Sequence, residues 1–191
     1  PNARYTPILL DGLKKRNIRA SFFLIGENIE GNEDILLQMR RDGHLIGNHT
    51  WDHVQLDKIP AEKARLEIEK TNNRIYEASG IYPSYVRPPF GAWSKDMELS
   101  VTMLPVFWDV DTLDWKTQDV ESTVEEVMNN VKDGSIILMH DIFSTSVDAA
   151  EILIPQLIEE GYQLVTVHEL ASLHQTELSA GVTYGEFNRI K

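Results

Sequence analysis

The sequence of 191 residues contains no cysteine. This absence excludes a disulfide framework, a thiolate metal site and a cysteine nucleophile, but it does not decide the cellular compartment. A metal ion would therefore have to be held by histidine and carboxylate side chains. The sequence also lacks a membrane-spanning apolar run, a low-complexity tract, an internal repeat and a signal peptide. Because the sequence starts at Pro1, an upstream segment could already have been removed. The absence of a signal peptide therefore says little about secretion.

Positive charge is scarce as well. Lys and Arg number 18 against 30 Asp and Glu, which gives a formal net charge of −12. Nucleic acids and anionic membranes attract basic surfaces, so this balance argues against both as partners and favours a neutral or weakly charged substrate. The length and the 42% hydrophobic content are those of one globular domain, which we predict over residues 1–191.

Helical and strand patterns alternate along the whole sequence. Thr6 is a candidate helix N-cap with Pro7 as the first helical residue, and Pro155 should kink the last helix. The patterns predict helices near residues 7–16, 32–43, 60–80, 95–104, 120–134 and 146–161, and six strands within 18–26, 44–48, 83–88, 105–112, 135–141 and 162–170.

This alternation predicts an α/β fold, a parallel sheet with helices outside it, either as a barrel or as a doubly wound sheet. Such folds normally begin with a strand, whereas this sequence begins with a helix. We therefore expect a further strand before Pro1.

Polar residues follow four of the predicted strands at their carboxyl ends, where parallel sheets gather their working residues. Because these ends meet at one edge, the sequence predicts that the residues share one pocket. They are His49 and His53, then Arg87, then Asp111, Asp114 and Trp115, and finally His140 and Asp141.

The pair His49 and His53 has the spacing of two metal ligands. The zincin motif is excluded, because it needs a glutamate directly after the first histidine and Thr50 stands there. A metal site after a strand remains open, as does a structural alternative in which one histidine caps a turn and the other lies on the surface. A catalytic metal also needs a third protein ligand, and this pair does not supply it.

The other candidates have structural alternatives too. Arg87, held by the two prolines that follow it, can form a structural ion pair, and the acids after the fourth strand can be solvated residues near a helix cap. His140 follows three apolar residues and can be a buried structural imidazole. Asp11 falls within a helical pattern and is discounted as a ligand. We interpret the remaining histidines, His44, His168 and His174, as structural or surface residues.

Together the motifs HTWDH, RPPF, DTLDW and LMH, in this order, resemble the polysaccharide deacetylases of carbohydrate esterase family 4, which share the NodB homology domain. The resemblance covers almost the whole chain, from Pro1 to about Leu170. It implies a distorted (β/α) barrel of about seven strands and a hydrolase that depends on a divalent metal. Zn²⁺ is the first candidate for this metal, and Co²⁺ or a similar ion is the alternative.

The resemblance also implies a role for each motif. His49 and His53 would bind the metal, Arg87 would orient the catalytic base, and the Phe90 amide would donate to an oxyanion. His140 would be the general acid, paired with Asp114 or Asp111. The acetyl pocket would be lined by Trp115 and Leu138.

The first motif of this family, Thr-Phe-Asp-Asp-Gly-Pro, holds the base and the third metal ligand, and Pro1 matches its proline. The resemblance therefore places both carboxylates, and the expected extra strand, just before Pro1, on a segment that could also stay docked as a separate fragment.

The implied activity is removal of acetyl groups from N-acetylglucosamine residues of peptidoglycan or chitin, outside the cell or at the cell wall. An acetylxylan esterase and a carbohydrate-binding domain without catalysis are the alternatives.

Overall fold

The computed structural model describes residues 1–94, 102–180 and 182–187, which group into two compact units. Unit 1 consists of Pro1–Ala20, Trp108–Thr176 and the described part of Gly185–Lys191. Unit 2 consists of Ser21–Phe107 and the described part of Glu177–Tyr184. Each unit has its own parallel sheet with helices packed on it, which confirms the predicted α/β class. That the chain forms one domain stays a prediction.

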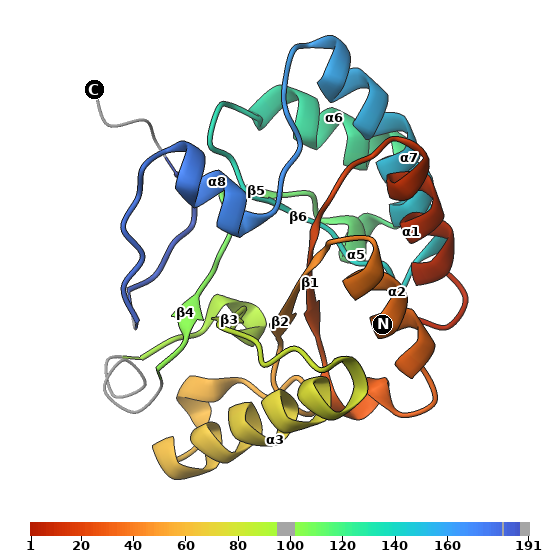
Figure 1. The fold of residues 1–191 in the computed structure, drawn as a ribbon. Coiled ribbons are helices and arrows are strands. Elements are labelled where there is room, and N and C mark those ends of the chain that lie inside the picture. The colour runs from red at the N-terminus through yellow and green to blue at the C-terminus, as the bar shows by residue number, and fades with distance from the viewer. Residues whose placement is uncertain (95–101, 181, 188–191) are drawn as a thin grey trace. The chain divides into compact units, whose positions relative to one another are not determined.

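Unit 2 is built on a four-stranded parallel sheet in the order β1-β2-β3-β4 (Figure 1). Its strands are β1 (Ser21–Leu24), β2 (Leu45–Asn48), β3 (Tyr85–Val86) and β4 (Leu104–Pro105). The helices are α2 (Glu33–Arg41) and α3 (Ala61–Ser79), with the 3₁₀ turns η1 (Gly26–Ile29), η2 (Leu56–Lys58) and η3 (Pro89–Gly91). One core cluster comprises Leu56, Ala64, Ile68, Val86 and Met103.

Helix α3 shows why this sequence folds as predicted. Pro60 occupies its N-cap and Gly80, with φ of 72°, ends it in the left-handed conformation that glycine adopts without steric cost. Ala64, Ile68 and Ile75 lie on one face at helical spacing and are buried. The helix packs against α2, η1 and β2, so its buried face lies directly behind the strand that precedes the two candidate metal ligands.

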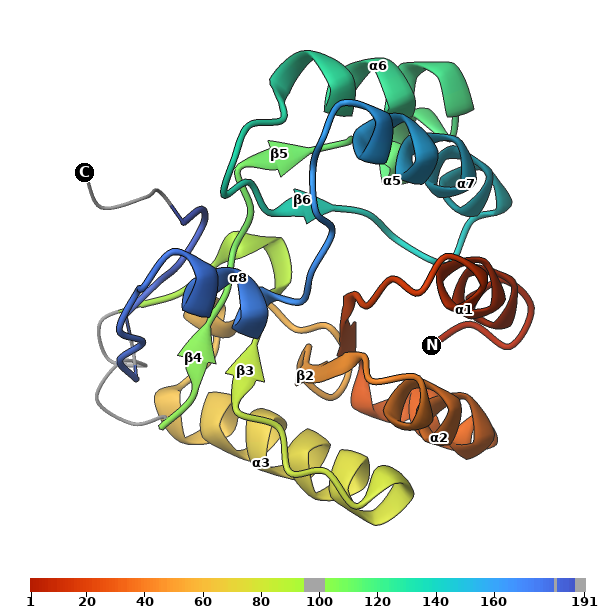
Figure 2. The same cartoon turned by 45° about the horizontal axis from the view of Figure 1, so that its top comes forward.

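Unit 1 contains the two-stranded parallel sheet of β5 (Val110–Asp111) and β6 (Ile137–Leu138). Its helices are α1 (Thr6–Lys15), α5 (Asp114–Thr117), α6 (Val120–Asn130), α7 (Ser144–Glu159) and α8 (Val167–Leu173). Helices α6 and α7 lie side by side, and α1 packs against α7 (Figure 2). A core cluster of Val110, Val127, Leu153 and Leu157 joins the sheet to these two helices.

The single strand predicted over residues 105–112 is wrong. Two short strands, β4 and β5, stand there in different sheets. The hydrogen bonds change partner along this segment: the Val106 amide donates to Val86, whereas the Asp109 and Val110 amides donate to Ile136. One short segment therefore serves two sheets, which its sequence pattern alone does not reveal.

The strand predicted over residues 162–170 is also wrong, because its second half begins α8. Thr166 caps this helix: its hydroxyl accepts from the Glu169 amide, and the Glu169 carboxylate accepts from the Thr166 amide at 2.9 Å. This capping box, Thr-x-x-Glu, is visible in the sequence and outweighs the β-branched run before it.

Three smaller predictions have different outcomes. The N-cap of α1 is Tyr5, and Thr6 is the first residue of the helix rather than its cap. The Thr6 hydroxyl donates to Asp141 Oδ2 at 2.5 Å instead of capping the helix. Helix α7 continues through Pro155. The helix predicted at 95–104 falls mostly outside the described residues, and Leu104 already belongs to β4.

Of the helices that the structure describes, none is both long and apolar enough to cross a membrane.

Gly47 of β2 is a position where the sheet has no room for a side chain. A methyl group there would lie 2.6 Å from two Phe23 ring carbons and 3.2 Å from the Tyr85 carbonyl oxygen. We expect Gly47→Ala to lower the free energy of unfolding by about 1–3 kcal/mol in urea denaturation, because the ring must shift. The loss should shrink in a Phe23→Ala background, and an unchanged loss would show that the ring is not the obstacle.

Candidate functional site

The first group of candidate residues follows the paired strands β2 and β3 in unit 2. Asn48 and Val86 are register partners at the strand ends, so His49 and Arg87 leave the sheet next to each other. The His49 Nδ1 lies 2.5 Å from the Arg87 carbonyl oxygen. A carbonyl only accepts hydrogen bonds, so this contact places the proton on Nδ1 and the lone pair of the ring on Nε2.

His53 is brought back to His49 by a tight loop. The two ring centroids are 4.8 Å apart, and Thr50 and His53 both have φ of 63°. The backbone of the loop is bonded on two sides: the Gly26 amide donates to the Thr50 carbonyl at 2.9 Å, and the Trp51 amide donates to Glu67 on α3 at 3.0 Å. Burial raises the pKa of Glu67. The loop is thus fixed by hydrogen bonds to η1 and α3.

Arg87 is buried, with 8% of its surface exposed. Its guanidinium lies 4.4 Å from the Phe23 ring centroid and donates to the carbonyl oxygens of Val106 at 3.4 Å and Phe107 at 3.2 Å. Burial lowers the pKa of Arg87 to about 10, which still leaves it a cation at neutral pH. The side chain therefore keeps a fixed positive charge beside the histidine loop.

Phe90 lies in η3 with a positive φ of 60°. Its ring meets the His53 ring edge-on at a centroid distance of 4.9 Å, yet 66% of the residue is exposed. The Phe90 ring therefore covers one side of the His53 ring while most of its own surface stays accessible. The role predicted for the Phe90 amide stays a prediction.

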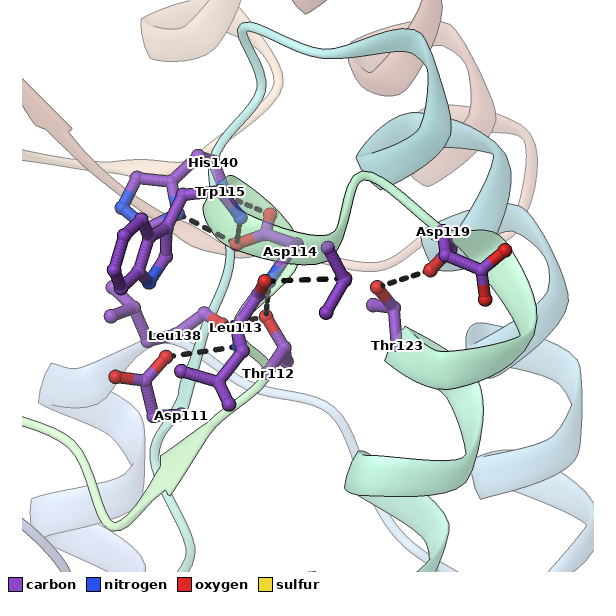
Figure 3. Close-up of polar contacts among 10 residues, drawn as sticks. Asp111, Thr112, Leu113, Asp114, Trp115, Asp119, Thr123, Leu138 and His140 are labelled. Atoms are coloured by element: carbon purple, nitrogen blue, oxygen red, sulfur yellow. Dashed lines mark hydrogen bonds and ion pairs between the residues drawn. The ribbon is translucent and has the colours of Figure 1, made fainter.

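The second group lies in unit 1 and is centred on Asp114 (Figure 3). The Asp114 side chain is 1% exposed. The His140 Nδ1 donates to Asp114 Oδ1 at 2.8 Å, the His140 amide donates to Oδ2 at 2.7 Å, and the Trp115 amide donates to Oδ1 at 2.8 Å. One carboxylate thus fixes both the backbone and the ring of His140 and leaves Nε2 as the nitrogen that can exchange a proton with a ligand.

The charge of Asp114 survives burial. Burial alone would raise the pKa of this carboxyl, but hydrogen bonds to its charged form, mainly from His140, outweigh it and lower the pKa. Of the two acids left open by the sequence, Asp114 is the partner of His140; Asp111 Oδ1 accepts from the Leu113 amide at 3.0 Å.

Thr112 supports the same arrangement. Its hydroxyl donates to the Leu138 carbonyl at 2.8 Å, which links β6 to the segment that enters α5. Trp115, in α5, is 48% exposed, whereas Leu138 is 7% exposed. Trp115 is therefore available to a ligand, and Leu138 belongs mainly to the core.

Asp141 has a partner that the sequence does not reveal. Its carboxylate accepts from the hydroxyl of Thr6, which is completely buried and lies 135 positions earlier. Asn48 and Glu67, which act on the histidine loop, were also missed. Such contacts are long-range, and only a polar residue at a predicted buried position hints at them.

The remaining sequence candidates divide into exposed and buried residues, and their predicted structural or surface role stays a prediction. Asp11 is exposed on α1 and His168 is exposed on α8. His44 and His174 are each 5% exposed. The structure gathers His49, His53, Arg87 and Phe90 in unit 2, and Asp111, Asp114, Trp115, Leu138, His140 and Asp141 in unit 1. A single pocket stays a prediction.

The residues of unit 2 fit part of a metal site. Ligand histidines typically donate their second ring N–H to a backbone carbonyl, as His49 does to Arg87, and the His53 ring lies close by. Within residues 1–94, 102–180 and 182–187, no group of three or more His, Cys, Asp or Glu side chains could hold a metal ion. The pair therefore offers two imidazole ligands to a metal that needs at least one more.

Comparisons with known proteins show the family of this chain. The polysaccharide deacetylase family matches residues 1–106. Peptidoglycan-N-acetylmuramic acid deacetylase PdaC of Bacillus subtilis strain 168 is 39% identical over 170 residues, which is 89% of this chain and 36% of that protein. The chain thus spans about a third of the length of the first curated relatives. The solved structure of PdaC superposes with a TM-score of 0.89 at 38% identity, over 92% of this chain and 87% of the solved chain.

Two further solved structures differ in their described activity. A family 4 acetyl xylan esterase from Clostridium thermocellum, in complex with a cobalt ion, is 30% identical with a TM-score of 0.92, over 97% of this chain and 94% of the other. BA3943 from Bacillus anthracis, described as a family pseudoenzyme, is 29% identical with a TM-score of 0.81, over 87% and 60%.

Asp114→Asn tests the carboxylate at the centre of unit 1. At pH 7 we expect the free energy of unfolding to fall by about 1–3 kcal/mol, because buried hydrogen bonds to a charge are weakened. Since the folded state lowers the pKa of Asp114, its stabilisation is complete above the unfolded pKa and is lost as the pH falls through the folded pKa. The difference from wild type in urea denaturation should therefore shrink in acid.

Asp111→Asn is the matched control, and it should change stability at pH 7 by no more than about 0.5 kcal/mol. A difference between wild type and Asp114→Asn that stays constant down to about pH 3 would contradict the assignment of a lowered pKa.

Proposed function

Because the chain belongs to the polysaccharide deacetylase family, we propose that the protein containing it is a metal-dependent hydrolase that removes acetyl groups from the N-acetylated sugars of a polysaccharide and releases acetate. The observation that carries this proposal is the His49–His53 pair, with His49 oriented by the Arg87 carbonyl. Family membership alone does not carry it, since a relative of known structure is described as a pseudoenzyme.

In this proposal His49 and His53 hold a divalent metal, for which Zn²⁺ is our first candidate and Co²⁺ the second. When bound, the metal would polarise the acetyl carbonyl and make its water more acidic. Two imidazoles are neutral ligands that suit either ion, and a relative was solved with cobalt. The third ligand and the general base are proposed to precede Pro1 in the natural protein, on a further strand or a docked fragment.

The residues of this chain would then have separate catalytic roles. The fixed cation of Arg87 would orient the base, and the Phe90 amide would donate to the oxyanion. His140, whose Nδ1 is held by Asp114, would protonate the leaving amine from Nε2. The exposed Trp115 would meet the acetyl group, with Leu138 behind it.

For the substrate we propose peptidoglycan first and chitin second, and we place the protein outside the cell or at the cell wall. The support is that PdaC and several other relatives are named as peptidoglycan deacetylases. The formal net charge of −12 is compatible with a glycan substrate and unfavourable for nucleic acid.

Acetate release from peptidoglycan by the full-length natural protein, loaded with Zn²⁺, tests the proposal. We expect His140→Ala to lower kcat by at least about a hundredfold, the usual contribution of a general acid. His168→Ala, at an exposed position of α8, is the matched control and should keep wild-type activity. No acetate from peptidoglycan, chitooligosaccharide or acetylxylan would refute the deacetylase and leave a carbohydrate-binding domain.

Acetylxylan is the alternative substrate, because a solved relative of high structural similarity is an acetyl xylan esterase. Release of acetate from acetylxylan at a higher kcat/KM than from peptidoglycan would favour this alternative.

The metal ligands are tested separately, by calorimetric titration of the metal-free full-length protein with Zn²⁺. His49→Ala and His53→Ala should each lower the affinity by at least about a hundredfold, because each removes a direct ligand, whereas the loss of an outer-shell partner costs about 10–100-fold. His44→Ala is less suitable as a control because it is buried, so His168→Ala serves again. Wild-type affinity in both loop variants would exclude this pair as the site.

A further inference from the structure

Asn48 is the last residue of β2 and directly precedes His49. Its side chain is completely buried. The Nδ2 donates to the Ile68 carbonyl at 2.8 Å and to Asn72 Oδ1 at 2.7 Å, both on α3. One amide group therefore ties the end of the strand to two turns of the helix behind it.

The other end of the same side chain acts on the histidine loop. Asn48 Oδ1 accepts from the Thr50 amide at 2.8 Å, and Thr50 is completely buried with φ of 63°. Non-glycine residues adopt this left-handed conformation only when their surroundings hold them there. The hydrogen bond from Thr50 thus fixes the turn that brings His53 to His49.

The backbone of Asn48 completes the connection. Its carbonyl accepts from the Arg87 amide at 2.9 Å, and the Arg87 carbonyl in turn receives the His49 Nδ1 hydrogen. Asn48 therefore contacts α3, the end of β3 and the loop between the two histidines, and these contacts engage both polar atoms of its side chain.

Only an amide side chain satisfies this set of contacts. The site needs two N–H donors for Ile68 and Asn72 and one acceptor for Thr50, and asparagine carries all three on a short side chain. Aspartate has no donor, and an apolar residue leaves buried polar groups unpaired. The contacts identify the residue type as well as the position.

We propose that Asn48 is a positioning residue of the metal site: it holds the His49–His53 loop in its binding geometry before the metal arrives. This inference rests on the proposed function of the two histidines. A loop that is already ordered loses less conformational entropy when the metal binds, so its affinity is higher than that of a loop that must first be ordered.

The test uses the full-length natural protein, freed of metal and titrated calorimetrically with Zn²⁺. Asn48→Ala removes the connection, and Asn72→Leu removes the acceptor on α3 together with the Asn72 Nδ2 donor to Met103 Sδ. The matched control is Asn73→Leu, at the next position of α3 but exposed. Circular dichroism first establishes that each variant is folded, and Asn72→Leu carries the test if Asn48→Ala does not fold.

We expect the Zn²⁺ dissociation constant to rise about 10–100-fold for Asn48→Ala and about tenfold for Asn72→Leu, the usual effect of losing a group that orients a ligand. The control should remain within about twofold of wild type, which is the scatter between variants that do not touch a site. A purely structural role would lower thermal stability but leave the affinity of the folded protein unchanged.

Wild-type affinity in the folded Asn48 and Asn72 variants would overturn the inference while leaving the metal site intact. No Zn²⁺ binding by the wild-type protein would instead overturn the proposed metal site, and the inference with it. The wild-type titration alone distinguishes these two failures.

Discussion

The parallel pairing of β2 with β3, in register at Asn48 and Val86, is the constraint on which the histidine site depends. Parallel strands end at the same edge of a sheet, so the residues that follow them emerge side by side. The contact between the His49 ring and the Arg87 carbonyl is a direct result. In unit 1 the parallel pair β5 and β6 has the same effect, because the segments that carry Asp114 and His140 leave one edge together.

Each unit buries a charge and stabilises it differently. Arg87 lies against the Phe23 ring and two backbone carbonyls, and burial lowers its pKa without removing its charge at neutral pH. Burial would raise the pKa of Asp114, but donors from His140 reverse the direction. A fixed cation in unit 2 and a fixed anion in unit 1 are thus held by dipoles and hydrogen bonds. The Asp114 carboxylate itself orients His140, whereas His49 is oriented by the backbone carbonyl of Arg87.

Much of this could be predicted from local patterns. The boundaries of α3 follow from Pro60 and Gly80, and every site residue proposed from the sequence lies beyond the end of a strand or, like Leu138, within one. The errors have two different causes, one long-range and one local. Residues 105–112 change sheets, and residues 162–170 contain a capping box that begins a helix. The spacing of Asp111 and Asp114 could not identify the partner of His140, because the choice depends on the turn into α5.

In the proposed site, His49 and His53 bind the metal together, in a loop that the fold has already ordered. X-ray absorption spectroscopy of the Zn²⁺-loaded full-length protein tests this most directly, because imidazole ligands give a characteristic scattering pattern at about 2.0–2.1 Å. We expect two imidazoles on the metal, together with oxygen ligands. A spectrum with no imidazole, or one that is unchanged in His49→Ala, would contradict it.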